Sequence, residues 1–363
     1  MRRIERHEPR PTLTRRATVF GLVVGVPASI LFLWLAARGI DYSELRRLLS
    51  NADLTLILLA MAAMLVVYAV QATRWRLIAR HERLLPRRVF FGMIVASLAV
   101  NNVVPGRPGE LLRGYWFSRA AGVPVSRGFG TVVVDRSSDV LVLFALLTLT
   151  LPLVAHEAWV KTVYVGALVL AGAVALALTV VWWYVSRSPR GVARGLAPEL
   201  PRSATRRFLS GVVRSTAQSL KTVDLVPVFA LSVLAWVIWG AGAWLAAESL
   251  GIRMSGVEIV FATALINLGV AIPSSPGFVG TYQWLTVSTL ALFGIDRTDA
   301  FAFSVLLHAI WFVPTTVLGF AIGIFAGLLR RDAGRSRSTQ EAEATRAREW
   351  RLTPGSPSGR RAR

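Results

Sequence analysis

A series of long apolar runs constrains this chain more than any other feature of its sequence. Each run holds roughly 19 or more mostly apolar residues, which as a helix is enough to cross about 30 Å of hydrocarbon. The chain is 54% hydrophobic and its mean hydropathy is +0.54, values typical of a membrane protein. We therefore predict an all-α polytopic membrane protein with six full spans, at residues 17–37, 54–72, 131–155, 162–185, 226–247 and 300–329.

Two further apolar runs, residues 89–104 and 257–272, are shorter. Each has about 16 residues, which rise only about 24 Å at 1.5 Å per residue, and each is followed by a proline. We predict that each forms the first arm of a re-entrant helical hairpin, whose tip is buried by protein or reached by water. The predicted hairpin gates are Pro105, Pro108, Gly109, Pro273, Pro276 and Gly277.

Charge supports this topology, because the basic residues lie in blocks between apolar runs. The net charge of +21 is concentrated in residues 2–16, 74–88, 187–221 and the segment from residue 330 onward. The positive-inside rule then places these blocks and both termini in the cytoplasm. We expect a basic tail (1–16), a transmembrane domain (17–329) and a disordered basic tail (330–363) attracted to anionic inner-leaflet lipids, and no nucleic-acid partner.

The two predicted tips resemble each other. Both have the pattern P-x-x-P-G, at residues 105–109 and 273–277, and both are followed by a stretch that ends in Gly-Val or Gly-Ile. The alternation of spans makes one hairpin open to the cytoplasm and the other to the opposite side. These features predict an inverted repeat with halves at residues 54–155 and 226–329, and a site between the halves.

Ionisable residues interrupt two apolar runs: Asp135, Arg136 and Asp139 in one, and His308 in the other. An arginine near the bilayer centre costs about 2.5–3.5 kcal/mol, so its charge must be offset. Asp135 and Asp139 share one helix face beside the guanidinium. Two interpretations remain open: a structural cluster that holds spans together, or a site that binds an anion or carries protons. For His308, hydrogen-bonded packing is the alternative to a substrate or proton role.

The first tip carries Arg107, Glu110 and Arg113 at spacings of three. A helix beginning at Gly109 offers free N–H groups, and two nearby guanidiniums suit a phosphate. The alternative is an amphipathic interfacial helix whose arginines extend toward lipid headgroups. The second tip supplies neutral hydrogen-bonding groups instead, from Ser274, Ser275, Tyr282 and Gln283.

The stretch "NNVVPGRPGELLRGYWFSRAAGVPVSRGFGTVVVDRSSDVLVLF" and the stretch "IPSSPGFVGTYQWLTVSTLALFGIDRTDAFAFSVLLHAIWFVPTTVLG" resemble the signatures of the lysylphosphatidylglycerol synthase transmembrane, or flippase-like, family. The resemblance adds Asn101 to the expected substrate-binding residues, with Arg107, Glu110, Arg113 and Arg136. It implies movement of an aminoacylated lipid across the membrane. We expect no aminoacyl-transferase domain in this chain, and the family often has glutamate at Asp135 and arginine at His308.

The sequence is compatible with three functions, of which we predict the first. We predict a translocator in the cell membrane for a phosphate-bearing lipid, such as an aminoacyl-phospholipid or a polyprenyl-phosphate sugar. The alternatives are an integral-membrane transferase that uses a polyprenyl-phosphate sugar, and an accessory protein that docks a cytoplasmic transferase through basic loops. We expect no metal, cofactor or catalytic residue, because no nucleophile elbow, phosphate-binding glycine loop or H-E-x-x-H motif occurs.

Overall fold

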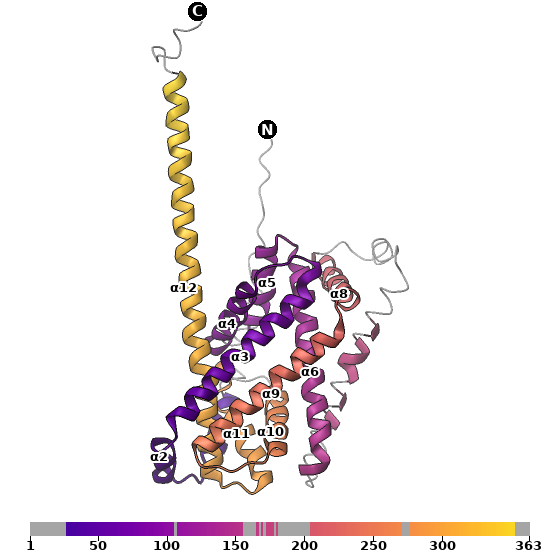
Figure 1. The fold of residues 1–363 in the computed structure, drawn as a ribbon, viewed down its shortest axis with the longest axis vertical. Coiled ribbons are helices and arrows are strands. Elements are labelled where there is room, and N and C mark those ends of the chain that lie inside the picture. Colours follow the sequence, from indigo (N-terminus) through magenta and orange to yellow (C-terminus); the bar gives the residue numbers. More distant parts are fainter. Residues whose placement is uncertain are drawn as a thin grey trace, which may run out of the picture.

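A computed structural model describes residues 27–104, 107–154, 165–166, 168–169, 172–177, 179–180, 204–270 and 276–352. Within these residues the fold is all-helical (Figure 1). Its elements are the helix Pro27–Ala37, α2 (Tyr42–Ser50), α3 (Leu54–Ile78), η1 (Ala79–His81), α4 (Arg87–Val103), α5 (Gly109–Ala121), α6 (Val125–Val154), α8 (Ala204–Thr222), α9 (Leu225–Ser249), α10 (Gly256–Gly269), η2 (Pro276–Phe278), α11 (Thr281–Leu290), η3 (Ala291–Phe293) and α12 (Arg297–Leu352).

Three stretches of described helix are long and apolar enough to cross a membrane: Leu54–His81, Leu225–Ser249 and Arg297–Ile324. They correspond to three of the six predicted full spans. The span predicted at residues 131–155 falls in α6, which is 30 residues long and contains the charged residues. The spans predicted at 17–37 and 162–185 lie partly outside the described residues, so the full set of six stays a prediction.

Two long apolar helices of the interior, α3 and α9, begin in the same way. Asp53 accepts hydrogen bonds from the N–H groups of Thr55 and Leu56 at the start of α3, and Asp224 accepts one from Val226 at the start of α9. Such caps satisfy N–H groups that have no partner within the helix. Both helices have 25 residues, and they pack against each other along the centre of the molecule (Figure 1).

The two short apolar runs form short helices, as the sequence predicts. α4 has 17 residues and α10 has 14, and each is followed by a break and a second helix, α5 and α11. α4 packs on α5, and α10 packs on α11, so each pair is a helical hairpin. Their entry into the membrane from opposite sides remains a prediction.

The glycines that end the two hairpins have the same local geometry. Gly122 has φ 69° and ψ 31°, and Gly294 has φ 71° and ψ 16°, a left-handed conformation that favours glycine. In each case the following residue closes the turn: Val123 N–H donates to Ser118, and Ile295 N–H donates to Leu290. This matches the correspondence between the halves that the sequence indicates, while the inversion of one half relative to the other stays a prediction.

The disorder expected after residue 330 stays a prediction, although part of that segment lies in a helix. Helix α12 continues from Arg297 to Leu352 and extends beyond the other helices (Figure 1). The reason lies in the local sequence, because Arg, Ala, Glu and Gln favour helix and no proline occurs between residue 329 and Pro354. Residues 353–363 lie outside the described part.

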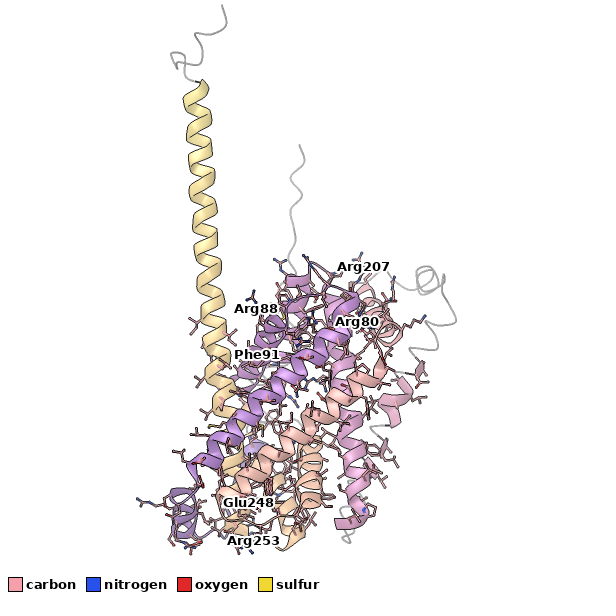
Figure 2. All side chains as sticks on the ribbon, viewed as in Figure 1. Arg80, Arg88, Phe91, Arg207, Glu248 and Arg253 are labelled. Atoms are coloured by element: carbon pink, nitrogen blue, oxygen red, sulfur yellow. The ribbon has the colours of Figure 1, made fainter. Side chains whose placement is uncertain are left out.

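The molecule has two distinct ends. Figure 2 shows Arg80, Arg88 and Arg207 at the end from which α12 projects, and Glu248 and Arg253 at the other. Helix α8 lies at the first end, where it packs on α6. Arg80 links η1 to α8, since its guanidinium donates to the carbonyl of Thr222 at the end of α8.

Helix α12 packs against α4 at Gly319, which gives a first prediction. A Cβ at Gly319 would lie 2.5 Å from the Cβ of Ala99 and 2.6 Å from the carbonyl oxygen of Val95, whereas a Cβ at Gly323 would meet nothing within 4 Å. We expect Gly319→Ala to separate the helices and lower the free energy of unfolding by about 1–3 kcal/mol. The matched Gly323→Ala should be neutral or stabilising, since alanine favours helix. Thermal unfolding in detergent tests this, and equal stability of the two variants would contradict it.

Candidate functional site

Two carboxylates on α6 form the base of the site. Asp135 is fully buried and Asp139 is 5% exposed, and they lie one turn apart on one face of the helix. A buried carboxylate is stable only when it is paired and hydrogen-bonded, so each of these groups requires cationic partners. Three arginines from three helices supply them.

Arg74 on α3 is the most enclosed of these arginines, with no exposed surface. Its Nε donates to Asp135 Oδ1 at 2.9 Å, and its Nη1 and Nη2 donate to the two oxygens of Asp139 at 2.6 and 3.1 Å. Nη1 also donates to Ser232 Oγ on α9 at 2.9 Å. Arg74 therefore ties α3, α6 and α9 together and has little capacity left for a ligand.

Arg113 on α5 approaches Asp135 from the first hairpin. Its Nη2 donates to Asp135 Oδ2 at 2.9 Å and lies 3.3 Å from Glu110 Oε2, one turn earlier on the same helix. Glu110 and Arg113, three residues apart, thus lie on one face of α5. The guanidinium also lies over the ring of Trp75, 4.6 Å from its centroid, a cation–π contact that stabilises the buried charge.

Arg136 differs from the other two arginines in its exposure and its contacts. Its side chain is 38% exposed, while those of Arg74 and Arg113 are at most 1% exposed. Its nitrogens lie 3.3 Å from Asp135, 3.4 Å from Asp139 and 3.7 Å from Glu110, longer distances than those of Arg74. The Nε of Arg136 is buried and is the atom that lies 3.7 Å from Glu110 Oε2, beyond hydrogen-bond distance. Arg136 is therefore the guanidinium with the most capacity for an added anion.

A cavity of about 250 Å³ lies beside this cluster and between the two hairpins. Its charged wall contains Arg107, Glu110, Arg113, Arg136 and Asp139. The rest of the lining is aromatic, aliphatic or amide: Tyr68, Gln71, Ile94, Ser97, Leu98, Val140, Leu143, Trp236, Trp239, Asn267, Leu268, Val270, Phe278, Tyr282 and Trp311. Both halves of the chain thus contribute to one cavity.

The tips of the two hairpins meet at this cavity. The guanidinium of Arg107 lies over the ring of Phe278, 4.8 Å from its centroid, and its Nη1 donates to the carbonyl of Val270 at 3.3 Å. Arg107 and Phe278 both have positive φ, 54° and 62°, which is uncommon outside glycine and indicates backbone strain. Contact between the tips therefore joins strained segments of the two halves.

Asn101 and His308 do not join the charged wall. The Oδ1 of Asn101 accepts from Gly109 N–H at 2.7 Å, and a Cβ on Gly109 would lie 2.0 Å from the carbonyl oxygen of Ser97. Asn101 thus closes the first hairpin, and Gly109 lets its arms approach. His308 is 6% exposed, stacks on Trp311 with ring centroids 4.7 Å apart, and bonds to the amide of Gln283 at 2.8 Å.

The remaining predicted residues divide between the two tips. Gln283 also accepts from Gly280 N–H at 2.7 Å, and Tyr282 lines the cavity. Pro108 precedes α5, and Gly277 adopts φ 65° inside η2, which begins at Pro276. Four predicted residues lie outside the described part of the chain: Pro105, Pro273, Ser274 and Ser275.

Sequence reasoning missed Arg74, which it assigned to a basic loop. The sequence does contain evidence for a helical Arg74, because Leu77 and Ile78 continue the apolar pattern beyond it and extend the helix to residue 78.

A second, apolar cavity of about 770 Å³ lies between α6, α8 and α9. Ser138 and Thr179 supply its polar side chains and it has no charged lining residue, so it lacks the groups that recognise an anion.

The fold and this site define a helical membrane protein with a buried ionic cluster beside a cavity shared by two helical hairpins. The chain belongs to the lysylphosphatidylglycerol synthase transmembrane-region family, whose model matches residues 18–319. This confirms the resemblance seen in the sequence.

Three relatives show the breadth of the similarity. The glycosyltransferase AglD of Haloferax volcanii is 26% identical over 94% of this chain, which spans only 59% of AglD. A UPF0104 membrane protein of Methanothermobacter thermautotrophicus is 23% identical over 83% of this chain and 93% of its own length. Another, from Methanocaldococcus jannaschii, is 23% identical over 61% of this chain and 91% of its own length.

The burial of Arg74 leads to a prediction about stability. Arg74→Met leaves two buried carboxylates short of their main partner, so we expect it to lower the free energy of unfolding by about 3–5 kcal/mol. Arg136→Met should cost clearly less, since that side chain is 38% exposed and Arg74 keeps both carboxylates paired. Thermal unfolding of both variants in detergent checks the difference. Arg74→Met with wild-type stability would show that the cluster is not structural.

Proposed function

We propose that this protein translocates a lipid with a phosphate in its headgroup, such as an aminoacyl-phospholipid or a polyprenyl-phosphate sugar. The observation that carries the proposal is the partly exposed side chain of Arg136, which lines the cavity and pairs with its carboxylates at longer distances than Arg74 does. A guanidinium binds a phosphate in bidentate geometry and keeps its charge throughout. Arg136 therefore supplies the headgroup contact.

The balance of formal charge around the cavity supports an anionic ligand. Four arginines and three carboxylates lie around the cavity, so one positive charge is unmatched. The arginines are Arg74, Arg107, Arg113 and Arg136, and the carboxylates are Glu110, Asp135 and Asp139. The unmatched charge belongs to Arg107, which is exposed at the first tip and would attract an anionic headgroup there.

Contact between the hairpin tips supports a route for release. Arg107 makes a cation–π contact with Phe278, and its Nη1 donates one hydrogen bond of 3.3 Å to the carbonyl of Val270 at the end of α10. Arg107 and Phe278 both have positive φ. Separation of the tips would break these two interactions and the packing of η2 on α4. In our proposal the tips open in turn toward opposite leaflets, as in transporters built from inverted repeats.

The proposed location is the cell membrane, with the end that carries Arg80, Arg88 and Arg207 facing the cytoplasm (Figure 2). Basic residues at that end would attract anionic inner-leaflet lipids, at about 1 kcal/mol for each side chain near the surface. Both termini would then be cytoplasmic.

The proposal predicts a specific loss of transport. Arg136→Ala should reduce translocation of a fluorescent phosphatidylglycerol in reconstituted vesicles by about 10- to 100-fold, which corresponds to one or two lost charge-assisted hydrogen bonds. Arg253→Ala is the matched control, because Arg253 is exposed at the opposite end (Figure 2). Wild-type transport by a folded Arg136→Ala protein would refute the role of this side chain.

The alternative function is a membrane transferase that uses a polyprenyl-phosphate sugar, and the name of the relative AglD favours it. The geometry gives it less support. Asp135 accepts from Arg74, Arg113 and Arg136, so it is poorly placed to act as a general base. Transfer of labelled sugar from such a donor by the purified protein would establish this alternative, and transport without turnover would exclude it.

The third possibility, an accessory protein for a cytoplasmic lipid-modifying transferase, is compatible with transport. The part of α12 that extends beyond the other helices lies at the basic end and offers a place for such a partner (Figure 1). Co-purification of an enzyme that depends on this extension would support it.

A further inference from the structure

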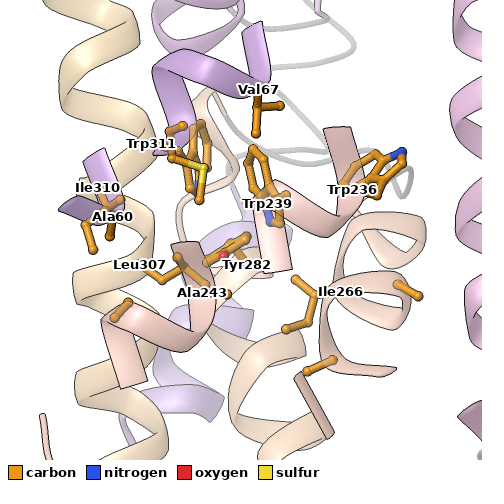
Figure 3. Close-up of a cluster of buried hydrophobic side chains, with 14 of the residues drawn as sticks. Ala60, Val67, Trp236, Trp239, Ala243, Ile266, Tyr282, Leu307, Ile310 and Trp311 are labelled. Carbon is orange, nitrogen blue, oxygen red and sulfur yellow. The ribbon is translucent and has the colours of Figure 1, made fainter. Parts of the chain in front are cut away.

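His308 on α12 is a buried ionisable group that the proposed function does not use. Its ring stacks on Trp311 with centroids 4.7 Å apart, and its centroid lies 5.1 Å from that of Tyr282. Trp311 and Tyr282 both line the cavity, and Figure 3 shows them in one buried cluster with Leu307 and Ile310 of α12. His308 therefore lies one ring away from the cavity, between α12 and the second hairpin.

The hydrogen bonds around His308 define which ring nitrogen carries the proton. Gly280 N–H donates to Gln283 Oε1 at 2.7 Å, and this contact requires the amide oxygen of Gln283 to face Gly280. The amide nitrogen of Gln283, which is a donor only, then faces His308 Nδ1 at 2.8 Å. Nδ1 is therefore the acceptor, and Nε2 carries the proton that His308 donates to the backbone of Gly277 in η2.

This arrangement requires the neutral form of His308. Both ring nitrogens are donors in the imidazolium, so protonation would set an N–H of the ring against the amide N–H₂ of Gln283. Rotation of the ring offers no remedy, because either nitrogen then presents a donor. Rotation of the amide would instead set its N–H₂ against Gly280 N–H. Protonation of His308 is thus incompatible with the closed second tip.

The groups that face His308 do not compensate a positive charge on its ring. Helix α11 contributes Tyr282, and Tyr68 of α3 lines the same cavity. The first hairpin contributes a cation, Arg107, which lies over the ring of Phe278 next to Gly277. Within the described residues, His308 forms no ion pair with a carboxylate.

The carboxylates of the helices that pack on α12 lie far from His308. On α12 itself Asp299 is nine residues away, or about 13.5 Å along the helix. Helix α2, which carries Glu44, contacts the start of α12, where Asp41 N–H donates to Thr298 Oγ1. Glu248 lies at the end of α9, near the end of the molecule opposite Arg80 (Figure 2).

The two hairpins are attached to α12 by different chemistry. On the first hairpin, the amide of Asn102 donates to two threonine hydroxyls of α12 at 2.7 and 3.2 Å, and none of these groups ionises. The second tip is attached through His308, which contacts Gln283 and Gly277. A change of protonation at His308 would therefore release the second tip and leave the attachment of the first intact.

We propose that His308 is a proton-operated latch on the second hairpin. The neutral ring holds the tip closed against α12, and uptake of one proton at Nδ1 releases it. The latch follows from the hydrogen bonds of His308, whereas its effect on transport rests on the function proposed above and names the regulation of that function. Release of the second tip alone would open the cavity toward one leaflet, so acid would favour release of the lipid on that side.

Hydrogen–deuterium exchange of the full-length protein in nanodiscs tests the latch. The quantity measured is the protection of Gly280 N–H, corrected for the intrinsic effect of pH on exchange. Between about pH 8 and about pH 4.5, the range in which histidine ionises, this protection should fall about 10- to 100-fold on acidification. The equivalent amide of the first hairpin, Gly109 N–H, donates to Asn101 and should keep its protection.

Two substitutions separate the latch from a general effect of acid. His308→Asn keeps an acceptor for Gln283 and takes up no proton, so the protection of Gly280 N–H should become independent of pH. Gln283→Glu keeps an oxygen for Gly280 and offers a carboxylate to the protonated ring. The second tip of that variant should stay closed to a pH about one unit or more below the wild-type value.

The matched control is His81→Asn, since His81 lies in η1 and contacts Ile78 and Glu82 instead of the hairpins. It should retain the wild-type response, and thermal unfolding verifies that each variant folds. The latch is refuted if wild-type protection at Gly280 does not depend on pH or if both hairpins lose protection together. It is equally refuted if His308→Asn or Gln283→Glu responds to pH as the wild-type protein does.

Failure of the proposed function has a different signature. If the protein is not a translocator of phosphate-bearing lipids, the vesicle assay shows no transport that depends on Arg136, while exchange at Gly280 still depends on pH. If both proposals hold, transport of fluorescent phosphatidylglycerol changes with pH in the wild-type protein, and His308→Asn removes that dependence.

Discussion

The ion pairs between Asp135 and its arginines are the interaction on which the rest of the structure depends. A carboxylate with no exposed surface requires neighbouring cations, and Arg74, Arg113 and Arg136 come from three separate helices to provide them. The three helices are therefore held around one point. Because Arg74 satisfies most of the carboxylate oxygens, Arg136 remains partly free beside the cavity.

The contact between the two hairpin tips is the second constraint on the fold. Arg107 and Phe278 bring left-handed backbone from both halves into direct contact over the cavity, a geometry that costs free energy and persists only where its surroundings maintain it. The ionic cluster holds the first hairpin through Arg113, and His308 holds the second through Gln283. These buried contacts thus hold in place the two tips that contain the strained residues.

Much of the local structure could be predicted from the sequence. Apolar period and length indicated the long helices, prolines and glycines marked the breaks, and spacings of three or four residues predicted which charges share a helix face. Glu110 and Arg113 illustrate this, since both lie on one helix and their spacing determines their contact. The Gly-Val and Gly-Ile pairs likewise predicted equivalent helix ends at Gly122 and Gly294.

Contacts between helices could not be read in this way. Arg74 is 61 positions from Asp135, and helical spacing carries no information about such a pair. Asn101 looked like a ligand group, but its partner is the backbone of Gly109, which becomes apparent only when the tip is folded. The excess of positive charge at the cavity follows from counting groups brought together from several helices, so it too depends on the tertiary structure.

The most direct test of the central claim is an experimental structure of the protein in nanodiscs that contain a phosphate-bearing lipid. The account predicts a phosphate within hydrogen-bond distance of Arg136 in the cavity between the hairpins, with the lipid chains outside it. A headgroup held instead in the apolar cavity between α6, α8 and α9, with Arg136 paired only to Glu110, Asp135 and Asp139, would contradict it.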